Sequence, residues 1–563
     1  MKITILSGGT GNNALYKGIK QFYPQADIKV IVNAYDSGKS TGICRKVTDT
    51  LGVSDIRKNH SRLYSITENP NKNYMDFLEG RYSLSTNNEE KEVFEKLNYW
   101  NIKEEFILDA VKHFFNLYKQ CQSKYLFEDF NIANIVYSAL FNKFGYEKTC
   151  ELMTNFLGIE NNVLINSFDN VYIQAITKNK NVIEDEGDIV NYKNADDPIK
   201  NIIYVGYYKR SFNNNAVNRI LDSDLIIISS GTFWSSIYPT LDYANFYLFI
   251  NESKAKKIWI MNNEQDKDAY GVSSNDFISI FENLGLELAR FNIIENNEAN
   301  ELLRQKNDFY DIKYYNLGND KGKHNSELVS ITILKEYYDF GNEFILDFDD
   351  TIWARNWKIN EEAHKVSREN VQLINELNKK FTIISGNSYE SIREKLKTIY
   401  GAYSLYNFRV PIVADANAVL YKEDKDQGII KDLQIDINDI RLIEGFLKAY
   451  NFKVEFPSSL TYIKIKPIDD KYREIICDYL NLIFETKRMQ LRAHITGTTT
   501  IDILKYNNDK SMVLTETNWA SKGATYIGDE VDHGNDNIIS KWCRNYIKVK
   551  DVFETNILLR LMK

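Results

Sequence analysis

Two aspartates that lie two residues apart open a pattern suited to phosphoryl transfer. Asp347 and Asp349 follow the apolar run EFIL, and Ser385 follows the apolar run TII. Lys510 comes much later, after a short polar loop. A carboxylate can attack phosphorus and a second one nearby can move the proton. A hydroxyl and an ammonium can then hold the phosphoryl oxygens. The spacing predicts a phosphatase that works through an aspartyl-phosphate.

Carboxylates in the same region are candidates for binding a metal ion. The segment GDEVDHGND at 528–536 places Asp529 directly after an apolar run, and Asp536 ends it. Mg²⁺ prefers oxygen ligands. We therefore expect Mg²⁺ as the cofactor, held by Asp347, Asp349, Asp529 and Asp536, with Asp536 acting through water or steadying the lysine.

Taken together, DFDDT, ISGNS, Lys510 and GDEVDHGND resemble the haloacid dehalogenase superfamily of phosphatases. Asp347 is then the nucleophile, and Asp349 protonates the leaving oxygen before it activates water. Lys510 opens a helix at the position that the family uses, and Lys505 on the preceding strand is the alternative. The family usually has Arg where this chain has Asn387.

The spacing of these motifs also predicts a cap. The segment between Asp349 and Ser385 is too short to hold a folded insertion, whereas the segment between Ser385 and Lys510 is long enough. We expect the cap at about 418–495, with an α/β pattern that resembles the phosphomannomutase and sugar-phosphatase branch. Such caps close over small phosphorylated metabolites and exclude water.

Two glycine turns near the start of the chain form a second candidate site. KITIL predicts a strand that enters Gly9-Thr10-Gly11-Asn12-Asn13-Ala14, followed by a helix and a second strand near Asp36. The first turn fits the GxGxxA fingerprint, where glycines let the backbone approach a phosphate at a helix N-terminus. By itself this turn is also compatible with a nicotinamide cofactor or with a tight strand–helix connection. The second turn, at 36–42, is not a Walker A loop because Asn33 stands where its first glycine should be.

Longer stretches of the front region resemble the 2-phospho-lactate transferase family, and more closely its gluconeogenesis-factor branch, which binds nucleotide-diphosphate sugars. The likeness rests on SGGTGNNALYKGIK, AYDSGKSTGICRK, GVSDIRKN, NIANIVYSAL and SDLIIISSGTFWSSIYPTL. It covers nearly all of residues 1–330. The resemblance implies a Rossmann-like fold, and its transferase members move a phospholactyl group from a guanosine diphosphate donor.

The family pattern implies ligand contacts at matching positions of this chain. These are Gly8, Gly9, Thr10, Gly11, Asn12, Asp36, Ser37, Gly38, Gly42, Asp55, Arg57, Asn134, Gly231 and Thr232. The chain departs from the family at Ser229 and Ser230, which replace Gly and Pro, and at Lys58, which replaces Asn. An ion pair between Asp55 and Arg57 with a purely structural role is the alternative to ligand contact.

The bulk properties favour an α/β protein of two domains. A chain of 563 residues is too long for one hydrophobic core. We expect a Rossmann-like parallel-sheet domain at 1–335 and a haloacid-dehalogenase-like domain with an α/β cap at 336–563. Apolar runs at 223–232, 245–250 and 257–262 predict alternating strands and helices, and 163–205 predicts short strands including NVIEDEGDIV.

The composition limits the classes of binding partner that we expect. The net charge of −8 argues against a nucleic-acid binder, and the five scattered cysteines give no zinc site and fit a reducing cytosol. No segment has the length of a signal peptide or a membrane span, so we expect a cytoplasmic protein. The resemblance to the family is compatible with a homodimer.

Two functions follow from the sequence. In the first, the protein is bifunctional: the front domain binds a nucleotide-diphosphate-linked metabolite and transfers its phosphate-bearing group, and the back domain dephosphorylates a small metabolite. In the second, the front domain is a non-catalytic nucleotide-sugar sensor that regulates the phosphatase or a partner. A phosphatase domain reduced to a scaffold is disfavoured because the expected polar groups are present.

Overall fold

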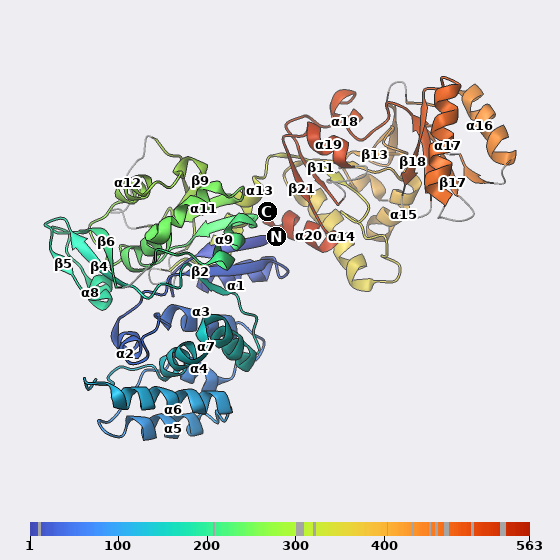
Figure 1. The fold of residues 1–563 in the computed structure, drawn as a ribbon. Helices are drawn as coiled ribbons and strands as arrows, with labels where there is room; N and C mark the ends of the chain where they lie inside the picture. The colour runs from blue at the N-terminus through green and yellow to red at the C-terminus, as the bar shows by residue number, and fades with distance from the viewer. Residues whose placement is uncertain are drawn as a thin grey trace. The chain divides into compact units, whose positions relative to one another are not determined.

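The computed structural model describes residues 1–9, 13–206, 209–299, 309–318, 323–401, 404–430, 433–449, 452–456, 460–466, 472–496, 500–529 and 536–563. The chain forms two compact units, Met1–Tyr337 and Tyr338–Lys563. Each unit has its own central sheet (Figure 1).

The first unit is built on a parallel sheet with the strand order β10-β9-β8-β7-β1-β2-β3. The strands are β1 (Lys2–Leu6), β2 (Asp27–Val32), β3 (Val163–Ile165), β7 (Leu225–Ile228), β8 (Lys256–Ile260), β9 (Phe291–Asn296) and β10 (Ile312–Tyr315). Strand β1 lies between β7 and β2, so the strand order reverses at this point. Open parallel sheets bind ligands outside the carboxyl ends of the strands at such a reversal.

Helices cover this sheet, and α2 to α7 gather below β1 and β2 in the view of Figure 1, with α5 and α6 farthest from the sheet. The helices are α1 (Asn13–Phe22), α2 (Lys39–Thr48), α3 (Ser54–Ser65), α4 (Lys72–Glu79), α5 (Glu89–Tyr99), α6 (Glu105–Gln120), α7 (Ile132–Leu157), α8 (Glu186–Asn191), α9 (Asn214–Leu221), α10 (Tyr238–Asp242), α11 (Tyr247–Glu252), α12 (Ser274–Leu284) and α13 (Ser326–Tyr338). A small antiparallel sheet orders β5 (Val182–Ile183), β4 (Tyr172–Thr177) and β6 (Ile199–Val205).

Two segments of this unit differ from the predicted strands. The run NVIEDEGDIV forms strand only at β5 and then enters α8, because the Asp185 side chain accepts the backbone N–H of Gly187 and caps the helix. The apolar run at 245–250 contributes to α11 and not to a strand. A short apolar run has no periodicity that separates a strand from a buried helix.

The second unit contains a mixed sheet with the order β15-β14-β13-β12-β11-β20-β21. The strands are β11 (Glu343–Asp347), β12 (Lys380–Ile384), β13 (Ile412–Ala414), β14 (Val419–Lys422), β15 (Lys425–Ile429), β20 (Thr525–Gly528) and β21 (Asn545–Lys548). Strands β13, β12, β11, β20 and β21 are parallel, and β14 and β15 continue the sheet antiparallel. The helices of this layer are α14 (Glu361–Glu376), α15 (Tyr389–Tyr400), α18 (Met512–Thr515), α19 (Asp536–Trp542) and α20 (Val552–Leu561).

An inserted module carries a separate antiparallel sheet with the order β16-β17-β19-β18. Its elements are α16 (Ile437–Ala449), β16 (Lys453–Glu455), β17 (Tyr462–Lys466), α17 (Arg473–Thr486), β18 (Leu491–Thr496) and β19 (Thr500–Lys505). The bounds therefore differ from the predicted 418–495 at both ends. Residues 419–429 form the hairpin β14–β15, which pairs with the larger sheet, and β19 completes the inserted sheet.

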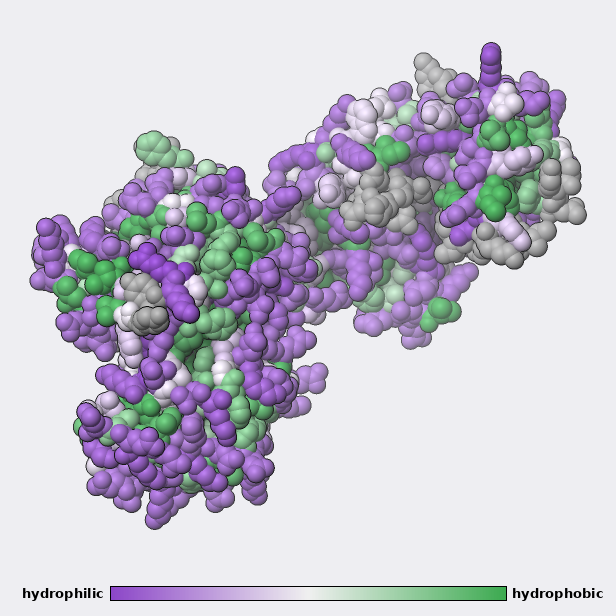
Figure 2. All heavy atoms as spheres, in the orientation of Figure 1, coloured by the Kyte–Doolittle hydropathy of each residue, from purple (hydrophilic) through white to green (hydrophobic). Residues whose placement is uncertain are grey.

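The surface in the view of Figure 2 is mainly hydrophilic, most evenly over the helices α5 and α6. Across the described ranges, none of the helices combines the length and the apolar character needed to cross a membrane.

Candidate functional site

The carboxyl ends of adjacent strands gather the predicted phosphatase residues in the second unit. Strand β11 ends at Asp347 and pairs in parallel with β12 and β20. Ser385 directly follows β12, and Asp529 directly follows β20. Because parallel strands end at the same edge of the sheet, side chains that are far apart in sequence meet there.

Lys510 reaches the predicted nucleophile. Its Nζ atom lies 2.5 Å from Oδ1 of Asp347, and both side chains are more than nine-tenths buried. It also donates a longer hydrogen bond of 3.5 Å to the hydroxyl of Tyr526. Lys510 follows β19, at the point where the chain leaves the inserted sheet. The alternative, Lys505, is the last residue of β19.

Asp349 is held by several donors at once. Its Oδ2 atom accepts hydrogen bonds from the hydroxyl of Ser385 at 3.2 Å and from the amide of Asn387 at 2.6 Å. Its Oδ1 atom lies 2.8 Å from Nζ of Lys395 on helix α15. Sequence reasoning missed Lys395, which belongs to no motif. Its charged group is buried beside a carboxylate of the predicted site, which only the fold shows.

The oxygen ligands that Mg²⁺ prefers are present at this edge, but they are not gathered into one cluster. Asp347 and Asp529 end neighbouring strands, and Oδ1 of Asp529 is 3.5 Å from the hydroxyl of Thr351. No group of three acidic, histidine or cysteine side chains among the described residues is placed to hold a metal ion. The carboxylate of Asp349 is instead occupied by Lys395 and Asn387. Asp536 begins α19, and its side chain lies outside the described part of the chain.

One face of the inserted sheet is polar. On the opposite face, Ile463, Ile465, Ile501 and Ile503 pack under α16 and α17. Side chains alternate along a strand, so Lys464 and Asp502 lie on the polar face, where they are paired across β17 and β19.

His494 on β18 faces Asp502 from the other side of β19. Burial, and then the charge of Arg492, lower the pKa of His494 to about 4. The inserted sheet therefore presents a mixed set of charged and polar groups on this face.

This polar face is turned toward the phosphatase loops. Tyr462 and Leu504, which share it by alternation, cluster with Ala416. The backbone N–H of Ala416 donates to the carbonyl of Gly386, one residue after Ser385. Arg492 on the same face donates to the carbonyl of Asn508 at 2.6 Å, two residues before Lys510. The inserted sheet therefore lies over the loops that carry the predicted catalytic groups.

In the first unit, the two glycine turns follow the adjacent parallel strands β1 and β2. Gly8 and Gly9 follow the end of β1 and are closely packed. A Cβ atom at Gly8 would lie 2.5 Å from Oγ of Ser236, and one at Gly9 would collide with Asp55 and Lys58. A larger side chain at either position would have to displace the side chains of Ser236, Asp55 or Lys58.

Asp36 organises the second turn. Its Oδ1 atom accepts the backbone N–H of Gly38 at 3.0 Å, and Oδ2 accepts the hydroxyl of Thr41 at 3.4 Å. Oε2 of Glu186 accepts the same N–H of Gly38 at 3.0 Å. Burial, and then the neighbouring carboxylates of Asp36 and Asp55, raise the pKa of Glu186 well above its ordinary value. Glu186 comes from α8 and was not predicted.

Asp55 pairs with Lys58 and not with Arg57. The Nζ atom of Lys58 lies 3.3 Å from Oδ1 of Asp55. Burial opposes the charge of Lys58, but Asp55 and Asp36 outweigh it and raise its pKa. The ion pair between Asp55 and Arg57, which was the alternative to ligand contact, is therefore replaced by Asp55–Lys58 and Arg57–Glu79, and Lys58, a departure from the family pattern, lies beside Gly9.

Arg57 and Asn134 are buried together away from solvent. Nε of Arg57 donates to Oδ1 of Asn134 at 2.9 Å, and its Nη1 atom donates to the carbonyl of Leu78. Asn134 in turn donates to the hydroxyl of Ser40 at 2.9 Å. These hydrogen bonds connect α3 and α7 to the start of α2 and so hold the second glycine turn in place.

The loops that follow the carboxyl ends of β7 and β8 form the rest of this candidate site. Both the N–H and the carbonyl of Gly231 bond to the amide of Asn262 at 3.0 Å, and Thr232 bonds to Ser236 at 2.8 Å. A hollow of about 20 Å³ opens between them, with Phe233 and Trp259 among its lining residues.

Two acidic side chains, Asp266 and Asp268, bond to residues beside this hollow. The Asp268 carboxylate accepts the N–H groups of Trp234 and Ser235, and burial raises its pKa to about 6. Burial, and then the charge of Asp268, raise the pKa of Asp266 to about 8. Sequence reasoning did not name this pair as site residues, although both lie in the run MNNEQDKDAYGVSSNDF at 261–277, which is part of the family resemblance.

The remaining predicted ligand-binding positions are Ser37, Gly42, Thr10, Gly11 and Asn12. Ser37 and Gly42 pack tightly, since a Cβ atom at Gly42 would collide with the carbonyl of Ser37. Thr10, Gly11 and Asn12 lie outside the described residues.

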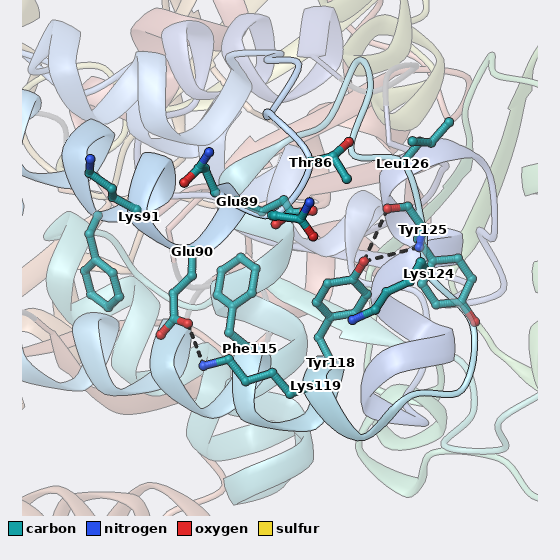
Figure 3. A pocket seen from close by; sticks show the side chains of 13 residues that line it. Thr86, Glu89, Glu90, Lys91, Phe115, Tyr118, Lys119, Lys124, Tyr125 and Leu126 are labelled. Atoms are coloured by element: carbon teal, nitrogen blue, oxygen red, sulfur yellow. Dashed lines mark hydrogen bonds and ion pairs between the residues drawn. The ribbon is translucent and has the colours of Figure 1, made fainter.

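A larger hollow of about 550 Å³ lies elsewhere in the first unit, between α5, α6 and the segment 121–126 (Figure 3). An ion pair of 2.8 Å between Lys119 and Glu90 crosses it, and Phe115 and Tyr118 line its apolar side. None of the predicted site residues lines it.

Comparison with known proteins adds independent information. Residues 3–331 match the family described as 2-phospho-L-lactate transferase CofD. A putative gluconeogenesis factor of Clostridium acetobutylicum is 22% identical over 315 residues, which are 54% of this chain and 58% of that protein. The chain thus spans less than two thirds of the length of this relative.

Two solved structures are each similar to part of the chain. A protein of Bacillus halodurans is 17% identical and covers 59% of this chain and 98% of its own, with a TM-score of 0.44. A haloacid dehalogenase-like hydrolase from Bacteroides thetaiotaomicron is 10% identical and covers 39% of this chain and 98% of its own, with a TM-score of 0.28.

Proposed function

Because the chain belongs to the 2-phospho-L-lactate transferase CofD family through residues 3–331, we propose that it is a bifunctional enzyme with one site in each unit. The first unit binds a nucleotide-diphosphate-linked metabolite and transfers its phosphate-bearing group. The second unit removes phosphate from a small phosphorylated metabolite.

The contact of Lys510 with Asp347 carries the phosphatase proposal. Asp347 attacks the phosphorus atom and forms an aspartyl-phosphate, while Lys510 and Ser385 hold the phosphoryl oxygens. Asp349 must carry a proton when the substrate binds; it gives this proton to the leaving oxygen, and the resulting carboxylate then takes a proton from the attacking water. Mg²⁺ bound by the carboxylates of Asp347 and Asp529 would neutralise phosphoryl charge.

The inserted sheet supports a small and polar substrate. Its face with Lys464, Asp502, His494 and Arg492 lies over the catalytic loops, so the leaving group would be enclosed between the two sheets. A closed site of this kind excludes water and favours a metabolite over a phosphoprotein.

A direct assay tests the phosphatase. The purified full chain should release phosphate from 4-nitrophenyl phosphate and from small sugar phosphates, and EDTA should abolish the release. If a broad panel of such substrates gives no phosphate with Mg²⁺ present, the phosphatase proposal fails.

The glycine turns at the reversal of strand order support a diphosphate site in the first unit. Gly8 and Gly9 follow β1 at this reversal, whereas the N–H of Gly38 bonds to Asp36 and Glu186 and that of Gly231 bonds to Asn262. Backbone N–H groups at such turns bind phosphate without a basic side chain.

A second candidate is favoured by the names that several similar proteins carry. Several are named putative gluconeogenesis factor and not transferase. In this alternative the first unit is a sensor that binds a nucleotide sugar without turnover and regulates the phosphatase or a partner.

Ligand binding and product release separate the two candidates. Nucleoside diphosphates and nucleotide sugars should raise the melting temperature of the full chain, since a ligand that binds only the folded state stabilises it. Release of a nucleoside monophosphate from a bound donor would identify a transferase. Binding without release under all acceptor conditions would identify the sensor.

A further inference from the structure

Lys395 belongs to none of the sequence motifs, yet its ammonium group lies inside the proposed phosphatase site. The residue is on helix α15, two turns after the loop that carries Ser385. Its side chain is 10% exposed, and Nζ lies 2.8 Å from Oδ1 of Asp349 and 4.9 Å from the ring centroid of Phe348. A buried lysine must find a compensating charge, and here that charge is the carboxylate assigned to proton transfer.

The donors around Asp349 have different tasks. Ser385 and Asn387 approach Oδ2 from the loop after β12, which also receives the phosphoryl group in the proposed function. These loop groups can turn toward a bound substrate. Lys395 approaches Oδ1 from the helix behind the loop and is packed against Phe348. It can therefore keep its bond to Asp349 while the loop groups exchange partners.

We propose that Lys395 is the positioning residue for Asp349, fixing its carboxyl group so that Oδ2 faces the leaving oxygen of an alkyl phosphate. The inference rests on the proposed phosphatase function. An ion pair restricts the rotation of the carboxyl group about its Cβ–Cγ bond. Proton transfer to an oxygen needs hydrogen-bond distance and alignment, and small displacements of the donor are costly.

This role predicts a dependence on the leaving group. An alkyl phosphate must gain a proton as the alcohol departs, because an alkoxide is a poor leaving group. 4-Nitrophenyl phosphate departs as a stable phenolate and needs little help. Loss of a well-placed general acid therefore slows the first substrate much more than the second.

The variant Lys395→Met removes the charge and keeps much of the bulk of the side chain. We expect kcat/KM for a small alkyl or sugar phosphate to fall roughly 10- to 100-fold, which is part of the effect of a general acid. For 4-nitrophenyl phosphate we expect a change of less than about threefold, on the same reasoning. The quantity kcat/KM is the right measure, because it reports the steps up to the departure of the alcohol.

Matched variants separate positioning from a general loss of structure. Lys397→Met changes a lysine of the same helix whose ammonium pairs with Glu390 and Glu394, and both substrates should be unaffected. Lys395→Arg retains the cation and should recover most of the activity on the alkyl phosphate. Lys395→Gln is the milder variant if Lys395→Met does not fold, with an intermediate loss of the same selectivity.

The outcomes are distinct. A wild-type protein that is inactive on both substrates would refute the proposed function and this inference with it. A wild-type protein active on both, together with a Lys395→Met variant that loses both equally or neither, would overturn the inference and leave the phosphatase in place. A selective loss with recovery in Lys395→Arg supports it.

Discussion

The buried pair of Lys510 and Asp347 makes a quantitative prediction. Lys510→Met leaves the Asp347 carboxylate buried without its partner at 2.5 Å. Removing one partner of a buried ion pair typically costs about 3–5 kcal/mol of stability. For a unit of this size each kcal/mol lowers the melting temperature by about 2–4 °C, so we expect a loss of roughly 6–20 °C for the second unit.

The same variant should lose phosphatase activity for a separate reason. Lys510 would hold developing negative charge on the phosphoryl group, and removing one such preorganised group typically costs about 10²–10³ in kcat. Adding Asp347→Asn to Lys510→Met removes both charges. The double variant should therefore regain a large part of the lost stability but none of the activity.

Calorimetry of the full chain and phosphate release measure these two effects. Mg²⁺ should stabilise the Lys510→Met variant more than the wild type, since it supplies a countercharge to Asp347. The reasoning is refuted if Lys510→Met is as stable and active as the wild type. It is also refuted if the double variant is no more stable than the single one.

Other predictions address the remaining features. Asp347→Asn should abolish turnover while circular dichroism remains that of the wild type, because it replaces a nucleophile by a near-isostere; full activity would remove Asp347 from the mechanism. Replacing 433–505 by a short Gly/Ser linker should erase discrimination among sugar phosphates but spare some hydrolysis of 4-nitrophenyl phosphate, and unchanged selectivity would show that the inserted sheet does not select substrates. Gly9→Val should abolish nucleoside diphosphate binding in calorimetry without changing phosphatase activity, since its side chain would collide with Asp55; equal affinity would contradict the phosphate-cradle interpretation. Asp266 has a folded pKa of about 8 against an ordinary 3.8, so its contribution to stability is present below pH 4 and is lost as the pH rises toward 8. Asp266→Asn should thus gain stability relative to the wild type between pH 4 and pH 8 in urea titrations, and a constant difference would argue against the raised pKa.

The amino-acid sequence was sufficient for features that depend on local pattern. The apolar runs KITIL and EFILD form β1 and β11, and each ends where a predicted site begins. A strand that enters a glycine turn or an aspartate pair carries its chemistry at its own carboxyl end. The family of the first unit could be recognised for the same reason, because its motifs are short and contiguous.

Features that depend on packing needed the tertiary structure. Arg57 proved to bond to Asn134 and to form an ion pair with Glu79 and not with Asp55, and Lys395 came from a helix to reach Asp349. In both cases a buried cation bonds to a residue far away in the sequence, and no periodicity of the sequence predicts which residue that is. The bounds of the inserted sheet were also decided by pairing, since the hairpin at 419–429 looks the same in sequence whichever sheet it joins. Sequence thus determined which residues could do chemistry, and burial with its demand for compensating charge decided which of them meet.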